Sequence, residues 1–365
     1  MIRCLVADDS RTFRAILRTV LARAPGVEVV AEAADGGEAV QKVVALRPDV
    51  VTMDVRMPGM DGLAAIAEIM QRAPTPVIVV SAEAGADRQR LAFEALALGA
   101  IEVLAKPRSD AAAFEHDAEA IRSAVRSVAG LRLVTRHRTP PRPSLGPSSV
   151  ALAPAEPAQV KPFPGPLPPR DPLAPAPTGA PAVVVGVVGS TGAPPVLASM
   201  LKGLPEGFRA PVIVVQHIAA GFEAGLAQWL SSEGRRPVKV AEDGEPLRPG
   251  STYLALEGRH LVVRSGLLYL TDDPPIRGFR PSGTVLLDAL AREYGPAAAG
   301  VVLTGMGDDG ADGLRSMRAR GAATAAQGPG SSVVFGMPRV AIEGGGAAET
   351  VEADDLAGWL RKVAR

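Results

Sequence analysis

The sequence predicts an α/β protein of two domains, each built on a mainly parallel sheet with helices on both faces. Short apolar runs alternate with helical patterns before about residue 130 and again after residue 182, as is typical of buried parallel strands joined by crossover helices. Between them, proline, alanine and serine replace the apolar pattern. With 365 residues, the chain also exceeds the size that one core usually supports.

The first domain, residues 1–130, is expected to contain five strand-helix units. The expected strands lie near residues 4–7, 27–33, 49–54, 77–82 and 101–107, and the expected helices near residues 11–24, 38–46, 63–73, 88–98 and 111–129. Five such units predict a doubly wound sheet of the flavodoxin-like (βα)5 type. The functional edge of such a sheet lies at the carboxyl ends of its strands.

Residues 131–181 are expected to be a Pro/Ala-rich linker. Proline lacks an amide donor and has a fixed φ, so this stretch cannot form a helix or a central strand. A proline-rich chain is semi-extended, and it would tether two domains while limiting how closely they approach.

The second domain, residues 182–365, contains three apolar runs that each end in a different polar residue. They are VVVGVVGS, ending at Ser190, VIVVQH, ending at His217, and GVVLTGMGDD, ending at Asp309. A β-hairpin is expected from residue 252 to 270. The serine does not lie in a G-x-S-x-G elbow, because Val188 stands two positions before it, and the order Ser, His, Asp differs from that of α/β-hydrolases.

Composition favours a cytoplasmic enzyme. Lys+Arg and Asp+Glu balance at 39 each, so no electrostatic reason predicts a nucleic acid or an anionic membrane as the main partner. The single cysteine, Cys4, cannot form an intramolecular disulfide. The first residues lack the pattern of a signal peptide, and no apolar stretch has the length of a membrane span, so no membrane insertion is expected.

The strand ends of the first domain predict an acidic site. Asp8 and Asp9 follow the first strand, Asp54 the third, Ser81 the fourth and Lys106 the fifth. Converging carboxylates repel one another unless a hard cation binds them, and Mg²⁺ takes oxygen ligands. Such an ion, with the ammonium and the hydroxyl nearby, would stabilise a phosphoryl group on Asp54.

The strand ends of the second domain predict nucleophilic catalysis. At one sheet edge, His217 would take the Ser190 proton and Asp309 would orient the imidazole. Each residue has an alternative interpretation, since His217 alone is more often structural and Asp309 could cap the helix near residues 311–320. A dinucleotide site is disfavoured because G-x-x-G-x-x-G is off pattern. The coincidence of three strand ends favours catalysis.

Residues 1–125 resemble the receiver domain of bacterial response regulators. The matching residues are Val6 to Ser10, the run Met53 to Gly62, Ser81 and Lys106-Pro107. The resemblance implies that a chemotaxis-type histidine kinase phosphorylates Asp54, that Asp8, Asp9 and Asp54 bind Mg²⁺, and that Ser81 and Lys106 sense the phosphate. Val103 departs from the switch aromatic that is common three positions before the lysine.

Residues 182–365 resemble the catalytic domain of the CheB family of chemotaxis protein-glutamate methylesterases. The matching motifs are Gly189 to Gly192, Gln216-His217, Arg280 to Ser282, Thr304 to Gly310 and Val334 to Pro338. The resemblance implies demethylation of methyl-accepting chemoreceptors and deamidation of specific glutamines, without a metal. It assigns Ser190 as nucleophile, His217 as base, Asp309 as orienting carboxylate and the Met306 amide to the oxyanion hole.

One departure from the family motif keeps another function open. Ala193 replaces a glycine of the family motif and would crowd the turn if that position required a positive φ. The rival interpretations are the same chemistry in a non-chemotactic pathway and a catalytically silent binding regulator under receiver control.

Overall fold

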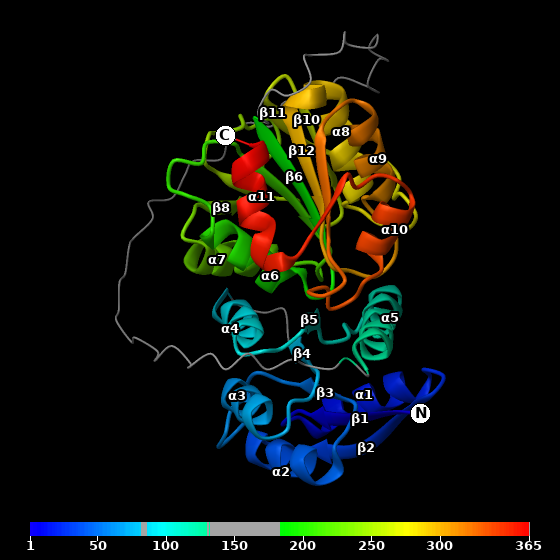
Figure 1. The fold of residues 1–365 in the computed structure, drawn as a ribbon. Helices are drawn as coiled ribbons and strands as arrows, with labels where there is room; N and C mark the ends of the chain where they lie inside the picture. The colour runs from blue at the N-terminus through cyan, green and yellow to red at the C-terminus, as the bar shows by residue number, and fades with distance from the viewer. Residues whose placement is uncertain (82–85, 130, 132–182, 365) are drawn as a thin grey trace, which may run out of the picture.

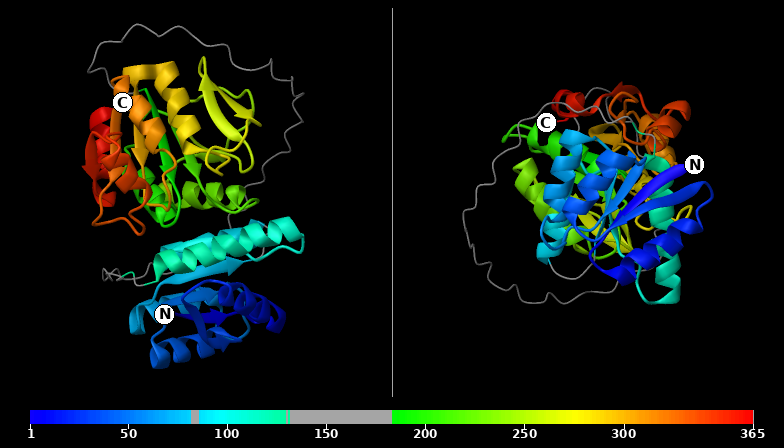
Figure 2. Two further views of the ribbon diagram at one scale, coloured as in Figure 1. Left: turned by 90° about the vertical axis from the view of Figure 1, so that its right-hand side faces the viewer. Right: turned by 90° about the horizontal axis from the view of Figure 1, so that it is seen from below.

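The computed structural model describes residues 1–81, 86–129, 131 and 183–364, and it places them in two stacked α/β bodies (Figure 1). The N-terminal body lies below the C-terminal one, and the side view in Figure 2 shows the same stacking. The predicted linker lies, apart from residue 131, outside the described residues. Two α/β bodies confirm the predicted fold class.

The N-terminal body is a five-stranded sheet of order β2-β1-β3-β4-β5, and every neighbouring pair is parallel. The strands are β1 (Ile2–Ala7), β2 (Val27–Ala33), β3 (Val50–Met53), β4 (Val77–Ser81) and β5 (Glu102–Ala105). The helices are α1 (Arg11–Ala22), α2 (Gly36–Leu46), α3 (Gly62–Arg72), α4 (Ala86–Ala97) and α5 (Ala111–Val128). Helices α1 and α5 lie on one face of the sheet, and α2, α3 and α4 lie on the other.

Four of these helices begin where a short polar side chain accepts a backbone N–H. The caps are Ser10 before α1, Asp35 before α2, Asp61 before α3 and Asp110 before α5. Such caps satisfy amides that have no partner within the helix. They fix the points at which the chain turns back after each strand.

The C-terminal body is a seven-stranded sheet of order β14-β13-β12-β6-β7-β9-β8, again with parallel pairs throughout. Its strands are β6 (Val184–Gly189), β7 (Val212–Gln216), β8 (Val238–Val240), β9 (Thr252–Leu254), β12 (Ala298–Val302), β13 (Ala323–Gln327) and β14 (Glu349–Val351). Its helices are α6 (Ala193–Lys202), α7 (Glu223–Gly234), α8 (Gly283–Tyr294), α9 (Ala311–Ala319), α10 (Met337–Glu343) and α11 (Leu356–Val363), with short 3-10 turns at Gly295–Ala297 and Ala353–Asp355. Helices α6, α7 and α11 cover one face, and α8, α9 and α10 cover the other (Figure 1).

A separate antiparallel hairpin, β10 (His260–Arg264) with β11 (Leu267–Thr271), packs beside α8. The hairpin is therefore shorter than the expected 252–270. The start of the expected hairpin, Thr252–Leu254, is instead β9, which pairs in parallel with β7 on one side and β8 on the other. All three of its residues are buried, so its place is inside the main sheet.

The two bodies meet where the carboxyl edge of the upper sheet faces α4, β5 and α5 of the lower body (Figures 1 and 2). The buried ring of Phe93 on α4 packs edge-on against Phe222, with centroids 6.3 Å apart, and stacks on Trp229 of α7 at 6.2 Å. Aromatic contacts of this kind stabilise the packing of the two bodies. Among the described helices, none is long and apolar enough to cross a membrane.

Candidate active site

Three neighbouring strands bring the predicted residues of the C-terminal body to one sheet edge. Strand β6 lies between β12 and β7, Ser190 follows β6, His217 follows β7, and Asp309 lies in the loop between β12 and α9. From β6 the chain passes to β7, which lies on one side of β6, and β12 lies on the other side of β6. Ser190 therefore sits at a topological switch point, where open α/β sheets bind their ligands.

Ser190 is held on a tight turn between β6 and α6. Its N–H donates to the Thr304 carbonyl at 3.1 Å, and its carbonyl accepts the Gln216 side-chain amide at 2.9 Å. Gly192 takes φ +78° and caps α6, and a Cβ there would stand 2.6 Å from Val333. The turn thus places Ser190 near a helix N-terminus, which favours developing negative charge.

Ala193 does not crowd this turn. The positive φ falls on Gly192, while Ala193 is the first residue of α6 and is fully buried. An L-residue is compatible with a helical backbone, so the departure from the family motif leaves the turn unstrained.

His217 and Asp309 form a direct pair. The imidazole Nε2 lies 2.9 Å from Asp309 Oδ2, and the two side chains are 14% and 2% exposed. Among the described residues, the buried Nδ1 has no hydrogen-bond partner. With Asp309 ionised, Nε2–H donates to the carboxylate and Nδ1 is left as the basic nitrogen.

Three donors from the start of α8 hold the Asp309 carboxylate. The Ser282 hydroxyl donates to Oδ1 at 2.7 Å, the Gly283 N–H to Oδ2 at 2.6 Å and the Thr284 N–H to Oδ1 at 3.0 Å. Burial alone would oppose ionisation, but the hydrogen bond and charge of His217, with these N–H groups, lower the pKa of Asp309 to about 2. The neighbouring Asp308 instead pairs with Arg277.

Met306 lies beside Ser190 and touches the N-terminal body. The preceding Gly305 packs so closely that a Cβ there would stand 2.7 Å from the Ser190 Cβ. The Met306 sulfur accepts the Ser123 hydroxyl of α5 at 3.4 Å and lies 3.7 Å from the Ser127 hydroxyl. The residue with the predicted oxyanion amide is therefore in contact with the lower body.

A cavity of about 480 Å³ lies between the two bodies and contains Ser190 and His217 in its wall. Glu257 lines it from the C-terminal body, and burial together with the charge of Glu223 raises the pKa of Glu257 to about 7. Residues of β5 and α5 line the opposite side. The described arrangement therefore leaves room at the serine for a substrate side chain.

Glu102 of β5 reaches the turn that carries the serine. Its Oε1 accepts the Thr191 hydroxyl at 3.0 Å, next to Ser190, while its Oε2 is buried without a hydrogen-bond partner among the described residues. Burial raises the pKa of Glu102 to about 7, and the Thr191 hydrogen bond only partly opposes this. An ionisable group thus sits inside the contact between the bodies.

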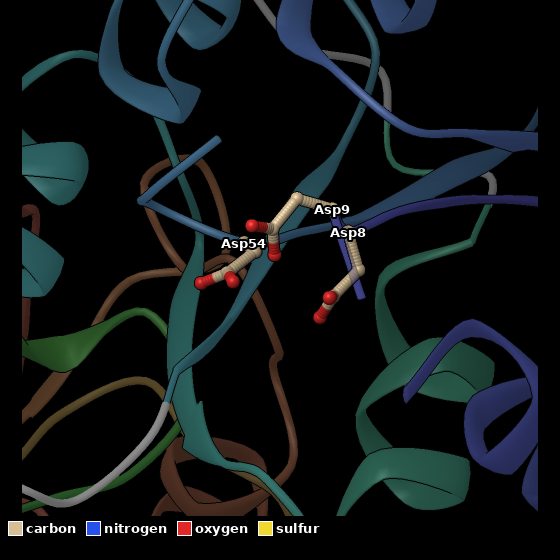
Figure 3. A group of neighbouring side chains, drawn as sticks. All are labelled: Asp8, Asp9 and Asp54. Carbon is tan, nitrogen blue, oxygen red and sulfur yellow. The ribbon is translucent and has the colours of Figure 1, made fainter. Parts of the chain in front are cut away.

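The second predicted site lies at the carboxyl edge of the lower sheet. Figure 3 shows the carboxylates of Asp8, Asp9 and Asp54 gathered there. One oxygen from each carboxylate lies within 4.8 Å of one oxygen from each of the other two. Burial raises the pKa of Asp8, although Lys106 opposes the shift. Three carboxylates at this spacing fit a small divalent cation, which would be held mainly by oxygen atoms.

Lys106 and Ser81 also border this site. The ammonium lies 2.7 Å from both Asp8 Oδ2 and Asp54 Oδ2, and burial opposes its charge while these carboxylates raise the pKa of Lys106. A hollow of about 220 Å³ is lined by Asp54, Ser81 and Lys106. All predicted residues of the N-terminal site therefore lie together. Val103, where a switch aromatic is common, is buried in β5 and faces the cavity between the bodies.

Three residues that contact the C-terminal site were not predicted from the sequence. Glu102 had one visible signal, because a carboxylate in an otherwise apolar strand is unusual. Ser282 was noted only as part of a motif, without its bond to Asp309. Phe279, which stacks on His217 with ring centroids 4.4 Å apart, carried no sequence signal at all.

The fold and the two sites define a response-regulator protein with an α/β output domain. Residues 4–116 match the response regulator receiver domain family, and residues 185–360 match the CheB methylesterase family. The chain therefore belongs to the CheB methylesterase family, in its form with an N-terminal receiver domain, and this confirms the resemblance seen in the sequence.

Similar proteins match over the full length of the chain. "Protein-glutamate methylesterase/protein-glutamine glutaminase 2" of Anaeromyxobacter dehalogenans is 44% identical over 100% of this chain and 97% of its own. "Protein-glutamate methylesterase/protein-glutamine glutaminase 4" of Myxococcus xanthus is also 44% identical, over 100% of this chain and 97% of its own. A solved structure, the CheB methylesterase catalytic domain of Thermotoga maritima, is 36% identical, covers 49% of this chain and 97% of its own, and has a TM-score of 0.48.

Proposed function

We propose that this chain is a protein-glutamate methylesterase and protein-glutamine glutaminase that acts on methyl-accepting chemoreceptors under control of its receiver domain. The observation that carries the proposal is the buried His217–Asp309 pair, 2.9 Å apart, at the sheet edge where β6 presents Ser190. The names of the relatives that match the whole chain supply the substrate class.

Ester cleavage would proceed by acyl transfer. The Ser190 hydroxyl attacks the carbonyl of a glutamyl γ-methyl ester while His217 Nδ1 takes the hydroxyl proton. Asp309, held ionised by its three donors, stabilises the resulting imidazolium through Nε2. The oxyanion forms near the Met306 amide and the N-terminus of α6, where N–H groups stabilise negative charge.

The second half of the reaction regenerates the serine. The imidazolium returns its proton to the leaving group, so methanol departs and an acyl-enzyme remains. Water then attacks the acyl carbonyl while His217 takes its proton. The imidazolium returns this proton to Ser190 Oγ as the bond between Oγ and the acyl carbon breaks, so the serine hydroxyl is restored and free glutamate leaves. Glutamine enters the same sequence with ammonia as the leaving group.

The receiver would gate this chemistry by covering the edge. Glu102 bonds to Thr191, and Ser123 bonds to Met306, so β5 and α5 lie over the turn and the loop that build the site. A chemoreceptor helix cannot reach Ser190 past this contact. Phosphorylation of Asp54 by a chemotaxis-type histidine kinase shifts the population to an open arrangement.

The receiver site would use Mg²⁺ during phosphorylation. Asp8, Asp9 and Asp54 would hold the ion, which supplies charge neutralisation for the incoming phosphoryl group. Lys106, already within 2.7 Å of Asp54, would move its ammonium onto the phosphoryl oxygens, and Ser81 would donate its hydroxyl. The ester-cleaving site requires no metal.

The direct test of the chemistry is methanol release from a methylated chemoreceptor fragment. Full-length protein is expected to release methanol, and Ser190→Ala and His217→Ala are expected to release none above background. Asp288→Asn provides the control, because this carboxylate pairs with Arg292 on the same helix and takes no part in the proposed chemistry. Methanol release by Ser190→Ala at the wild-type rate would refute the proposed nucleophile.

A further inference from the structure

One aromatic ring outside the proposed triad lies flat on the catalytic imidazole. The rings of Phe279 and His217 have centroids 4.4 Å apart and planes inclined by 8°. Phe279 is half-buried and lines the same cavity as Ser190. Gly307 also lies beside this ring, since a Cβ added there would come within 3.7 Å of Phe279.

A tight turn presents this ring. Ile276 and Phe279 exchange backbone hydrogen bonds of 3.1 and 2.9 Å, and the two residues between them, Arg277 and Gly278, have φ of 51° and 88°. Positive φ at both central positions is typical of a two-residue hairpin turn. Arg277 anchors the turn to α9 through Asp308 and through Asp312 at 2.9 Å.

The same short segment also supplies the donors on Asp309. Phe279 covers the imidazole, and Ser282, with the two residues after it, binds the carboxylate. The Arg280 carbonyl between them accepts the Gly258 N–H at 3.0 Å, so the segment is fixed at its centre. Residues 279–284 therefore hold both members of the His217–Asp309 pair.

A parallel aromatic ring has two effects on an imidazole. It prevents the ring from rotating, so that, with Nε2 fixed by Asp309, the direction of Nδ1 is defined. It also offers the negative face of its π-system to a positive charge, which favours a cation within about 6 Å of the centroid. In the reactive form of the enzyme the imidazole is neutral and becomes positive as it takes the serine proton, so this stabilisation is greater in the transition state than in the ground state.

We propose that Phe279 is a positioning residue of the esterase: it orients His217 and stabilises the imidazolium that forms during acyl transfer. The inference rests on the proposed Ser190–His217–Asp309 chemistry. Because its ring acts through the imidazole, its loss lowers kcat more than it raises KM.

The test compares three variants of the full-length protein in methanol release from a methylated chemoreceptor fragment, with a saturating small phosphodonor and Mg²⁺. Phe279→Leu is expected to lower kcat by about 2- to 30-fold, with KM changed by less than about twofold. The acid limb of its kcat/KM profile is expected to move to lower pH, because the imidazolium is less stable without the ring. Phe279→Tyr, which keeps the aromatic face, is expected to restore both values.

Ile276→Ala is the matched control, since this side chain belongs to the same turn and is 40% exposed. It is expected to match the wild type, which separates loss of the ring from disturbance of the turn. A Phe279→Leu enzyme with wild-type kcat, or with a loss of kcat but an unmoved acid limb, would overturn the inference. Thermal unfolding of each variant excludes misfolding as the cause. Failure of the triad itself is distinguishable, because His217→Ala would then remain active.

Discussion

Replacing Glu102 by glutamine is expected to remove a pH dependence from domain closure. In the closed arrangement burial raises the pKa of Glu102 from 4.5 to about 7. In an open arrangement the carboxyl faces water and has its ordinary pKa. Closing therefore takes up a proton, so the closed state gains stability as the pH falls below about 7 and loses it as the pH rises toward that value.

The size of the effect follows from the difference between the two pKa values. Complete titration of Glu102 changes the free energy of domain closure by about 3 kcal/mol. Between about pH 6 and about pH 8, a range suited to the assay, the ratio of closed to open protein changes by about tenfold. Glutamine keeps an acceptor for the Thr191 hydroxyl but cannot titrate, so this change disappears.

The assay is the fold-activation of methanol release by a saturating phosphodonor, measured at each pH, because this ratio cancels the pH dependence of the chemistry itself. The wild-type ratio is expected to fall about tenfold between the two pH values, and the Glu102→Gln ratio to stay constant. Other titratable groups line the cavity, namely Arg108, His116, Asp117, His217, Glu257 and Arg280.

Glu257→Gln is the control for these groups. Burial and the charge of Glu223, which belongs to the same domain, raise the pKa of the Glu257 carboxyl to about 7. This variant is expected to keep the wild-type dependence of the ratio on pH. An equal pH dependence in Glu102→Gln and wild type would refute the reasoning.

Two further predictions concern the support of the triad. Asp309→Asn keeps the shape of the side chain but removes the charge that faces Nε2, and kcat for methanol release is expected to fall about 10³- to 10⁴-fold; a loss below about tenfold would contradict the assigned role. Gly283→Ala places a Cβ 2.2 Å from Val188 Cγ1, and the overpacking is expected to cost about 1–3 kcal/mol in thermal unfolding. Gly207→Ala, where nothing lies within 4 Å of the added Cβ, is its control; equal melting temperatures for the two variants would contradict the packing argument.

The sequence was sufficient to predict the layered fold and which side chains the strand ends bring to one edge. Buried runs such as β7 read as parallel strands, and chain order determines that their carboxyl ends share one edge. The start of the hairpin was predicted wrongly, because β9 is short and its place in the main sheet depends on partners on both sides. Short apolar runs do not specify their partners.

Contacts between distant segments could not be predicted. Glu102 meets Thr191 only because the two domains pack face to face, and no periodic pattern describes such packing. Phe279 reaches His217 through a turn that contains Arg277, and the partner of Arg277, Asp312, lies outside the turn on α9. Local sequence patterns predict how one segment folds, but Glu102 and Phe279 make their contacts with segments that are distant in the sequence.

The central claim is that the receiver controls the esterase through Asp54. The decisive measurement is methanol release from a methylated chemoreceptor fragment by full-length protein, with and without a small phosphodonor and Mg²⁺, compared with Asp54→Ala. Methanol release that rises with the phosphodonor in the wild type and stays at the basal level in Asp54→Ala is the predicted result. Equal rates with and without the phosphodonor in the wild type, under conditions where Asp54 is phosphorylated, would contradict the account.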